Sequence, residues 1–222
     1  MCGIIGIISE EDVSSSIYES LTVIQHRGQD AAGMATLEDG KLHVRKQIGL
    51  VREVFRAQHI KNLKGKMGIG HVRYPTAGGV TREFSQPLYV NSPYGISICH
   101  NGNLVNSKEL TQELYENDLR HLNTDSDSEV ILNIFANEMQ KINSQSPSPE
   151  EIFSAVEKMH LRLKGAYSVV LMISGVGLLA IRDPNGIRPL MMGKKENDLL
   201  GKTDYMFASE SPALDALDFE IL

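Results

Sequence analysis

The sequence predicts an α+β domain in which antiparallel or mixed sheets are covered by paired helices. Three observations favour this fold class. Strand-like segments gather at both ends of the 222-residue chain, two strong helical patterns occupy its central block, and the regular strand–helix alternation of a doubly wound parallel sheet is missing. We therefore expect a sheet-based core with helices on its outer faces.

The first two elements follow from the spacing of apolar residues. GIIGIIS (3–9) is a short Ile-rich run bounded by Gly and acidic residues, which predicts a strand buried on both faces. SSSIYESLTVIQHRG (14–28) carries apolar residues at helical spacing and ends on Gly28, a natural helix stop. A buried strand followed by an amphipathic helix is therefore expected at the start of the chain.

The next segments predict a hairpin and a further strand. Residues 32–37 and 41–47 are strand-like and flank the turn-like pair Asp39-Gly40. MGIGHVRY (67–74) indicates another strand. PTAGGVTREFSQP (75–87) then breaks all periodicity, and we expect it to be a mobile loop.

The central block is expected to begin with a strand, a turn and a strand over 88–103, followed by a short helix over 107–117. A longer helix is predicted over 124–142, because its apolar residues share one face. Ser126 and Glu129 match a capping box at its start.

A second long helix is predicted over 149–163, because SPEE at its start supplies a cap, a first-turn proline and a capping-box glutamate. Residues 166–174 and 177–183 indicate a hairpin of two strands. The chain is expected to end with a strand over 205–209 and a short helix over 211–217.

The composition limits the classes of function. Hydrophobic residues make up 41% and charged residues 23%, which is typical of a globular protein. The net charge is −6 and no run of Lys or Arg stands out, which argues against nucleic acid or an anionic membrane as a partner. The sequence has no signal-peptide pattern and no apolar stretch of membrane-spanning length. Its two cysteines form no disulfide or metal-ligand pattern, so we expect a cytoplasmic protein without a metal site.

Cys2 stands where removal of Met1 would place a thiol and a free α-amino group on one residue. The amine titrates near ~7.7–8 and the thiol near ~8.5, so the neutral amine can take the thiol proton near neutral pH. An N-terminal nucleophile of this kind is a known variant of the catalytic triad. A small buried residue at the start of a strand is the alternative, and position alone leaves both interpretations open.

HNGN (100–103) offers the side-chain amide of Asn101 beside the backbone N–H of Gly102. Two donors aimed at one oxygen are what an oxyanion hole requires, although an ordinary Asn-Gly turn has the same sequence. His100 is not needed as a general base when an N-terminal amine is present. We therefore expect His100 to be structural.

Charged residues complete the set. Arg73 lies at the end of a predicted strand, where its planar fork suits a carboxylate, and Arg27 at a helix stop is a second candidate. A surface salt bridge is the alternative for each. Asp125 and Asp127 surround a helix start, either as partners of the helix dipole or as a carboxylate for a substrate ammonium. A thiol, an oxyanion pair, a cation and an anion together point to an α-amino acid whose side-chain carbonyl is attacked, and hence to glutamine hydrolysis through a thioester.

The whole chain resembles the glutaminase domain of the amidophosphoribosyltransferase family. The resemblance rests on these motifs in order: MCGIIGI (1–7), QHRGQDAAG (25–33), GHVRYPTAG (70–78), CHNGNL (99–104), TDSDSE (124–129), KGAYS (164–168) and RDPNGIRPL (182–190). The wider group is the class-II glutamine amidotransferases of N-terminal-nucleophile hydrolase fold. The resemblance implies a four-layer αββα sandwich that releases ammonia from L-glutamine for the first step of purine synthesis.

The resemblance also implies roles for individual residues. Cys2 would be the nucleophile with its own α-amino group as base, and Asn101 and Gly102 the oxyanion pair. Arg73 would bind the carboxylate of glutamine, and Asp127 its ammonium. Asp125 precedes the family motif and is left out of this set.

Further positions are implied around the pocket. Arg27 and Gly28, in QHRG, resemble residues that line it. Tyr74, and Thr76 within the 75–87 loop, resemble the segment that closes over glutamine. No propeptide precedes Cys2, so removal of Met1 is expected to mature the chain.

Residues 1–222 are expected to form the glutaminase domain of a longer, homo-oligomeric enzyme. The phosphoribosyltransferase domain, where Mg²⁺ would act with phosphoribosyl pyrophosphate, is expected to be absent from this chain, and no cofactor is expected in the glutaminase domain. This chain has RGQD where glucosamine-6-phosphate synthases usually have RGYD and asparagine synthetases usually have RGPD. It has VRYPT where glucosamine-6-phosphate synthases usually have TRWAT. The alternatives are the glutaminase domain of such a relative, or a non-catalytic amino-acid-binding module.

Overall fold

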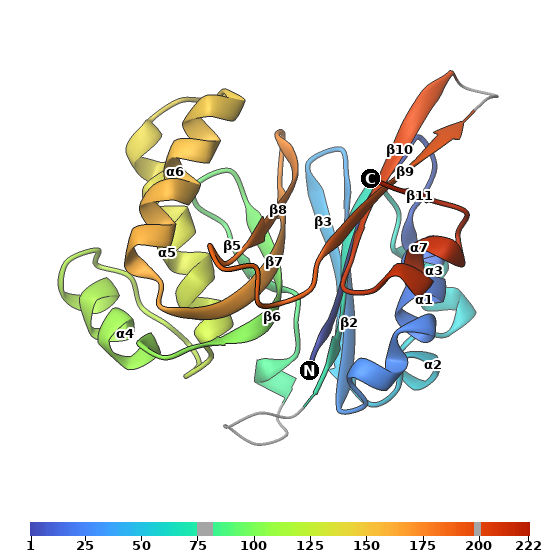
Figure 1. Ribbon diagram of the computed structural model, residues 1–222, viewed down its shortest axis with the longest axis horizontal. Helices are drawn as coiled ribbons and strands as arrows, with labels where there is room; N and C mark the ends of the chain where they lie inside the picture. The colour runs from blue at the N-terminus through green and yellow to red at the C-terminus, as the bar shows by residue number, and fades with distance from the viewer. Residues whose placement is uncertain (75–81, 198–200) are drawn as a thin grey trace.

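The computed structural model describes residues 1–74, 82–197 and 201–222. Two sheets lie face to face, and every pair of neighbouring strands in them is antiparallel (Figure 1). The larger sheet has the strand order β11-β9-β10-β1-β4-β2-β3, and the smaller has the order β5-β6-β7-β8. The strands are β1 (Gly3–Ile8), β2 (Ala31–Glu38), β3 (Lys41–Ile48), β4 (Met67–Arg73), β5 (Leu88–Val90), β6 (Ile96–Leu104), β7 (Gly165–Ile173), β8 (Gly177–Arg182), β9 (Met191–Asn197), β10 (Lys202–Ala208) and β11 (Glu220–Ile221).

Helices cover the outer face of each sheet. Figure 1 shows α4, α5 and α6 against the smaller sheet and α1, α2, α3 and α7 against the larger one. The helices are α1 (Ser14–Val23), α2 (Val51–Val54), α3 (Ala57–Asn62), α4 (Ser107–Glu116), α5 (Asp127–Ile142), α6 (Pro149–Arg162) and α7 (Ser211–Asp215). The predicted α+β class and the αββα layering are confirmed.

Alternation along β1 explains why this strand is buried on both faces. Ile5 and Ile7 pack among the residues under the helices of the larger sheet, whereas Ile4 packs between the two sheets. Ile4 meets Cys99 from the smaller sheet in that inner layer, and both side chains are fully buried. The strand that begins beside Cys2 is therefore fixed from two sides, since each of its faces removes apolar surface from water.

Local differences from the expected elements have physical reasons. The predicted helix 14–28 ends at Val23, and a separate 3₁₀ turn (Gln25–Arg27) follows it. The strand β9 was not anticipated, because its sequence MMGKKEN is polar and lies near an open edge of the sheet. The short elements α2, α3 and β11 also carried no clear pattern.

Of the two predicted capping boxes, one is confirmed and one is wrong. Ser148 and Glu151 bond each other's backbone N–H groups at the start of α6. At the start of α5, Ser126 instead accepts a hydrogen bond from the backbone of Ser128. The Glu129 carboxylate turns away to accept bonds from residues 123 and 124, because four donors of the preceding loop surround it.

Part of the loop predicted over 75–87 lies outside the described residues, which resume with a 3₁₀ turn (Arg82–Phe84). Throughout the described ranges, no helix is both long and apolar enough to cross a membrane.

Candidate active site

A cavity of about 520 Å³ opens where β1 begins, β4 ends and β6 passes the start of α5. Five of the residues proposed from the sequence line it: Cys2, Arg73, Tyr74, Gly102 and Asp127. The remaining described lining residues are Phe84, Gln86, His100, Asn103, Ser107, Lys108, Thr111, Asp125, Ser126 and Ser128. Segments far apart in the chain therefore supply one pocket that contains a thiol and charges of both signs.

Cys2 sits at the cavity wall, one residue before β1. Its Sγ lies 3.9 Å from the carbonyl oxygen of Tyr74, a weak thiol hydrogen bond. Burial raises the pKa of the thiol, so this site by itself does not favour a thiolate. With Met1 attached, the nitrogen of Cys2 is an amide and has no basic lone pair. A base becomes available on Cys2 only when Met1 is removed.

The described residues that line this cavity do not include Arg27 or Gly28. The expectation from the QHRG motif that both line the pocket is therefore corrected. Arg27 lies behind Cys2, where its Nε donates to the Cys2 carbonyl oxygen at 2.9 Å. Its Nη1 pairs at 2.5 Å with Glu210. Gly28 packs against the end of β4, since a Cβ there would lie 2.4 Å from the carbonyl carbon of Arg73. Both residues support the pocket from outside.

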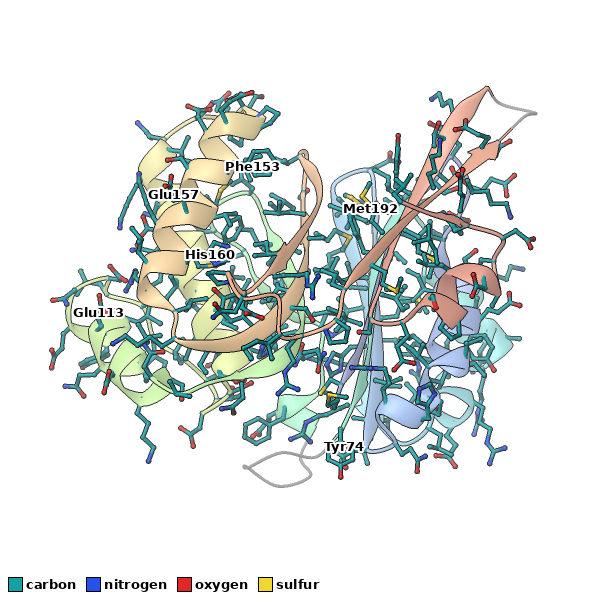
Figure 2. All side chains as sticks on the ribbon, in the orientation of Figure 1. Tyr74, Glu113, Phe153, Glu157, His160 and Met192 are labelled. Carbon is teal, nitrogen blue, oxygen red and sulfur yellow. The ribbon has the colours of Figure 1, made fainter. Side chains whose placement is uncertain are left out.

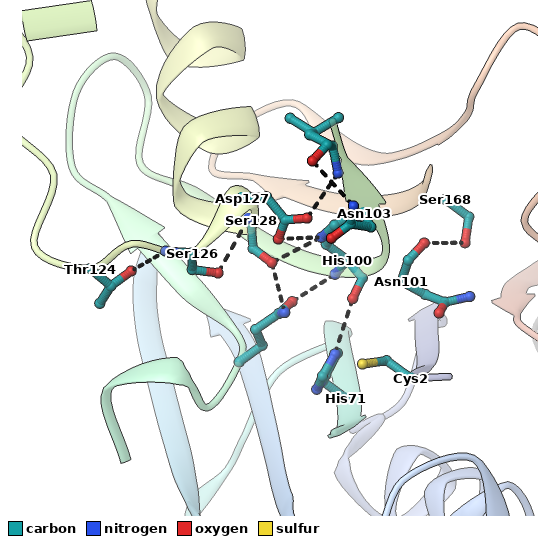
Figure 3. A network of polar contacts seen from close by, with 12 residues as sticks. Cys2, His71, His100, Asn101, Asn103, Thr124, Ser126, Asp127, Ser128 and Ser168 are labelled. Carbon is teal, nitrogen blue, oxygen red and sulfur yellow. Dashed lines mark hydrogen bonds and ion pairs between the residues drawn. The ribbon is translucent and has the colours of Figure 1, made fainter. Parts of the chain in front are cut away.

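The alternation of the strands brings Asn101 toward Cys2. Ile4 and Cys99 face each other between the sheets, and Cys2 and Asn101 continue these two rows by one step each. Figure 3 shows Cys2 and Asn101 in this part of the molecule. Asn101 is 1% exposed and is not itself among the lining residues of the cavity. Its Nδ2 is buried and has no hydrogen-bond partner among the described residues, which leaves the N–H donors of this amide available.

Gly102 is required by close packing. A Cβ at this position would lie 2.2 Å from the carbonyl oxygen of Ala166 on β7 and 2.7 Å from Nε2 of His100. No side chain fits there without moving the backbone of β7. The Asn-Gly pair is consequently part of a strand, because β6 extends to Leu104 and pairs with β7 along its whole length. The interpretation as an ordinary hairpin turn is therefore wrong.

Arg73 ends β4 and reaches the cavity as a nearly buried cation. Its Nη1 lies 2.5 Å from Oδ2 of Asp30, and the two side chains expose only 6% and 8% of their area. The guanidinium carbon lies 5.4 Å from the centre of the Phe84 ring, within range of a cation–π contact. Two groups thus fix the orientation of the guanidinium, and the simple surface salt bridge considered for Arg73 is excluded by its burial.

Asp127 is the first residue of α5, where the helix dipole favours a carboxylate. Its Oδ2 accepts a hydrogen bond of 3.1 Å from the backbone N–H of Leu104. Its Oδ1 lies 3.6 Å from Nδ1 of His100. The carboxylate is thereby oriented on the cavity wall, and its oxygens keep lone pairs for a further donor. Asp125 also lines the cavity, at an exposed position.

His100 is buried within a network of polar contacts (Figure 3). Its Nδ1 lies 2.9 Å from Oγ of Ser128. Burial lowers the pKa of the imidazole, so His100 is neutral at physiological pH. These contacts agree with the structural role expected for it.

Tyr74 and Thr76 were predicted to close over a ligand. Tyr74 lies at the rim of the cavity with 52% of its surface exposed, and Figure 2 shows its side chain at the outer end of the fold. Thr76 lies outside the described residues. In the same described part of the chain, no group of three or more His, Cys, Asp or Glu side chains is arranged to hold a metal ion.

Comparison with known proteins decides the family. Residues 79–216 match the family model described as "Glutamine amidotransferase domain". The chain belongs to the glutamine amidotransferase domain family. Among curated relatives of this amidotransferase domain, the amidophosphoribosyltransferases of Pseudomonas aeruginosa and Escherichia coli are 53% and 52% identical to it. The match covers 100% of this chain and 44% of each relative.

A solved structure supports the same assignment. The glutamine phosphoribosylpyrophosphate amidotransferase from B. subtilis, complexed with ADP and GMP, superimposes with a TM-score of 0.81 at 34% identity. The superposition covers 100% of this chain and 44% of that one. The amidotransferase domain described here thus spans less than half the length of the relatives it matches.

Three supporting residues of the amidotransferase site were missed from the sequence. Asp30 holds Arg73, Glu210 holds Arg27, and Gln86 bonds to both His100 and Ser128. Asp30 belongs to the RGQD motif, so the motif could have identified it. Glu210 and Gln86 carried no such signal, because their partners are fixed only by the folded chain.

Proposed function

We propose that this domain hydrolyses L-glutamine to glutamate and ammonia through a thioester on Cys2. The observation that carries the proposal is the meeting at one cavity of four groups with complementary chemistry. The thiol of Cys2, the guanidinium of Arg73 and the carboxylate of Asp127 line the cavity. The fourth group is the amide nitrogen of Asn101, which is buried next to Gly102 of the lining and has no hydrogen-bond partner among the described residues. Membership of the glutamine amidotransferase domain family supports glutamine as the substrate.

The reaction begins once Met1 has been removed. The α-amine of Cys2 takes the thiol proton, and the thiolate attacks the side-chain carbonyl carbon of glutamine. The amide nitrogen of Asn101 and the backbone N–H of Gly102 donate to the oxyanion that forms. Collapse of this intermediate expels ammonia, with the proton returned by the α-ammonium group. Water then attacks the thioester and releases glutamate and the thiol.

Recognition of the α-amino acid uses the two charges of the cavity. Arg73 pairs with the substrate carboxylate through its planar fork, while Asp30 and Phe84 hold the guanidinium in place. Asp127 accepts the substrate ammonium, because the backbone N–H of Leu104 already orients its carboxylate. A ligand that lacks either main-chain charge is expected to bind poorly.

The whole protein would pass the ammonia to a phosphoribosyl acceptor. This part of the proposal rests on the names of the relatives, since the chain spans 44% of their length. A phosphoribosyltransferase domain outside this chain would hold phosphoribosyl pyrophosphate with Mg²⁺. We further propose a cytoplasmic homo-oligomer that acts in purine synthesis without a nucleic-acid or membrane partner.

Glutamine turnover tests the proposal directly. Ammonia and glutamate are measured for the chain beginning at Cys2 and for its Cys2→Ala variant. We expect stoichiometric release of both products from the first protein and none from the second. Equal rates for the two proteins would overturn the proposal.

A further inference from the structure

The strand that carries the Asn101-Gly102 pair loses its neighbour on one side. β5 pairs with β6 only from Leu88 to Val90, opposite Ile98 to Ile96. If this antiparallel register continued, residue 86 would stand opposite His100. Pro87 has no backbone N–H to donate, and β5 begins only after it. The β6 edge at His100 therefore lacks a backbone partner from β5.

The side chain of Gln86 takes the place of the missing strand. Its Oε1 accepts a hydrogen bond of 2.7 Å from the backbone N–H of His100. Its Nε2 donates to Oγ of Ser128 at 2.9 Å. Gln86 is 6% exposed, so these bonds form away from bulk water, where an unpaired polar group costs most. One amide thus joins the edge of β6 to the first turn of α5.

A second side chain holds the other end of the same residue. Nε2 of His71, on β4 of the larger sheet, lies 3.1 Å from the carbonyl oxygen of His100 (Figure 3). Burial lowers the pKa of His71 to about 3, so the ring is neutral and acts as an ordinary N–H donor. The backbone N–H and C=O of His100 are therefore both held by side chains, immediately before Asn101.

The backbone of Gln86 is closely packed against the larger sheet. A Cβ on Gly33 of β2 would lie 1.9 Å from the backbone oxygen of Gln86, so the larger sheet admits this segment only against a glycine. Lys46, the partner of Gly33 on the neighbouring strand β3, donates to the carbonyl oxygen of Pro87 at 2.9 Å. The position of the Gln86 side chain is consequently set by the fold around it.

We propose that Gln86 is a positioning residue for glutamine hydrolysis. It acts through His100 to set the position of Asn101 and Gly102, and through Ser128 to set the start of α5, where Asp127 lies. This inference rests on the proposed function. Gln86 does not need to touch the substrate for this role, although it lines the same cavity. Loss of its amide is expected to impair the oxyanion donors more than the binding of glutamine.

The test compares Gln86→Met with Gln86→Glu in the chain beginning at Cys2. Methionine keeps the length of the side chain and removes both polar ends. Glutamate keeps the acceptor for His100, and Ser128 can then donate to it while accepting from the imidazole. Gln58→Met, at an exposed glutamine on α3, is the matched control. We expect Gln86→Met to lower kcat by roughly 10- to 100-fold with KM within twofold, because it disturbs groups used in the transition state. Gln86→Glu is expected to recover most of kcat, and the control to match the wild type.

Hydrogen exchange at the backbone amide of His100 gives a readout that does not depend on activity. We expect faster exchange in Gln86→Met and protection in Gln86→Glu. If the wild type is active and Gln86→Met is fully active too, the role of Gln86 is overturned while the proposed function stands. Equal exchange rates at His100 in the wild type and Gln86→Met would have the same consequence. A KM increase with unchanged kcat would overturn it too. A wild-type chain that releases no ammonia would overturn the proposed function, and the inference with it.

Discussion

Arg73 and Asp30 form an ion pair of 2.5 Å in which both side chains are almost completely buried. The pair joins the last residue of β4 to the residue just before β2, two strands that are neighbours in the larger sheet. Arg73 also lines the cavity, so the same cation serves the fold and the pocket. Its replacement therefore has two consequences that an experiment must separate.

Arg73→Lys separates them better than Arg73→Ala. Alanine would leave Asp30 buried without its partner, which typically costs about 3–5 kcal/mol of stability. Lysine keeps the charge and loses the planar fork, so KM for glutamine is expected to rise roughly tenfold or more with a small change in Tm. Steady-state kinetics and thermal unfolding check this. An unchanged KM with a large loss of Tm would contradict the assignment of Arg73 to the substrate carboxylate.

Asn101→Ala is expected to lower kcat without lowering stability. Among the described residues the buried Nδ2 atom of Asn101 has no hydrogen-bond partner, so its removal leaves no new unsatisfied group there. Loss of an oxyanion donor typically costs about 2.7–4 kcal/mol, which is a fall of roughly 10²–10³-fold in kcat. We expect this fall with an unchanged or higher midpoint of denaturant unfolding.

Asn137→Ala is the matched control for that variant. Asn137 on α5 also buries an Nδ2 atom that has no partner among the described residues, but neither it nor its chain neighbours line the cavity, whereas Asn101 lies between the lining residues His100 and Gly102. We expect full activity from it. A comparable loss of kcat in both variants would mean that repacking, rather than a missing donor, explains the effect of Asn101→Ala.

Glu210→Gln tests the support behind the nucleophile. Glu210 pairs with Arg27, and Arg27 donates to the carbonyl oxygen of Cys2. Burial acts to raise the pKa of Glu210, but the hydrogen bonds and charges of Arg27 and His26 together hold it below its usual value. The neutral amide weakens this link, so we expect a lower kcat and a modest loss of Tm. Glu196→Gln, at an exposed position on β9, is the control and is expected to match the wild type.

The burial of His71 is expected to make the free energy of unfolding depend on pH. Burial lowers its pKa from 6.5 to about 3 in the folded protein. Between these values the unfolded chain binds a proton that the folded chain does not, so stability falls as pH falls from 6.5 toward 3. The contribution is at most about 1.4 kcal/mol per pH unit.

Chemical unfolding of the wild type and His71→Gln from pH 7 to pH 4 checks this dependence. Glutamine at position 71 retains an N–H donor and does not titrate. The unfolding free energy of the His71→Gln variant is therefore expected to decline less steeply than that of the wild type as pH falls. Parallel pH profiles for the two proteins would contradict a neutral, buried His71.

The sequence predicted the features that depend on local pattern. The strand β1, buried on both faces, follows from its short apolar run, and the hairpins and the two long helices follow from apolar spacing, turn residues and caps. The strand β9 was not predicted, because it is rich in charged residues and Lys195 and Glu196 remain exposed. At the site, Cys2, Arg73 and Asp127 could be proposed from the sequence, because each lies at the start or end of a predicted helix or strand. Pairings such as Arg27 with Glu210, 183 residues apart, depend on strand order, which no local pattern contains.

We propose that Cys2 becomes a nucleophile only when its own amine is free. The most direct test combines intact mass with ammonia release, using one sample that retains Met1 and one that begins at Cys2. We expect glutamine hydrolysis only in the sample whose mass shows that Met1 is gone. Equal hydrolysis by the sample that retains Met1 would contradict it.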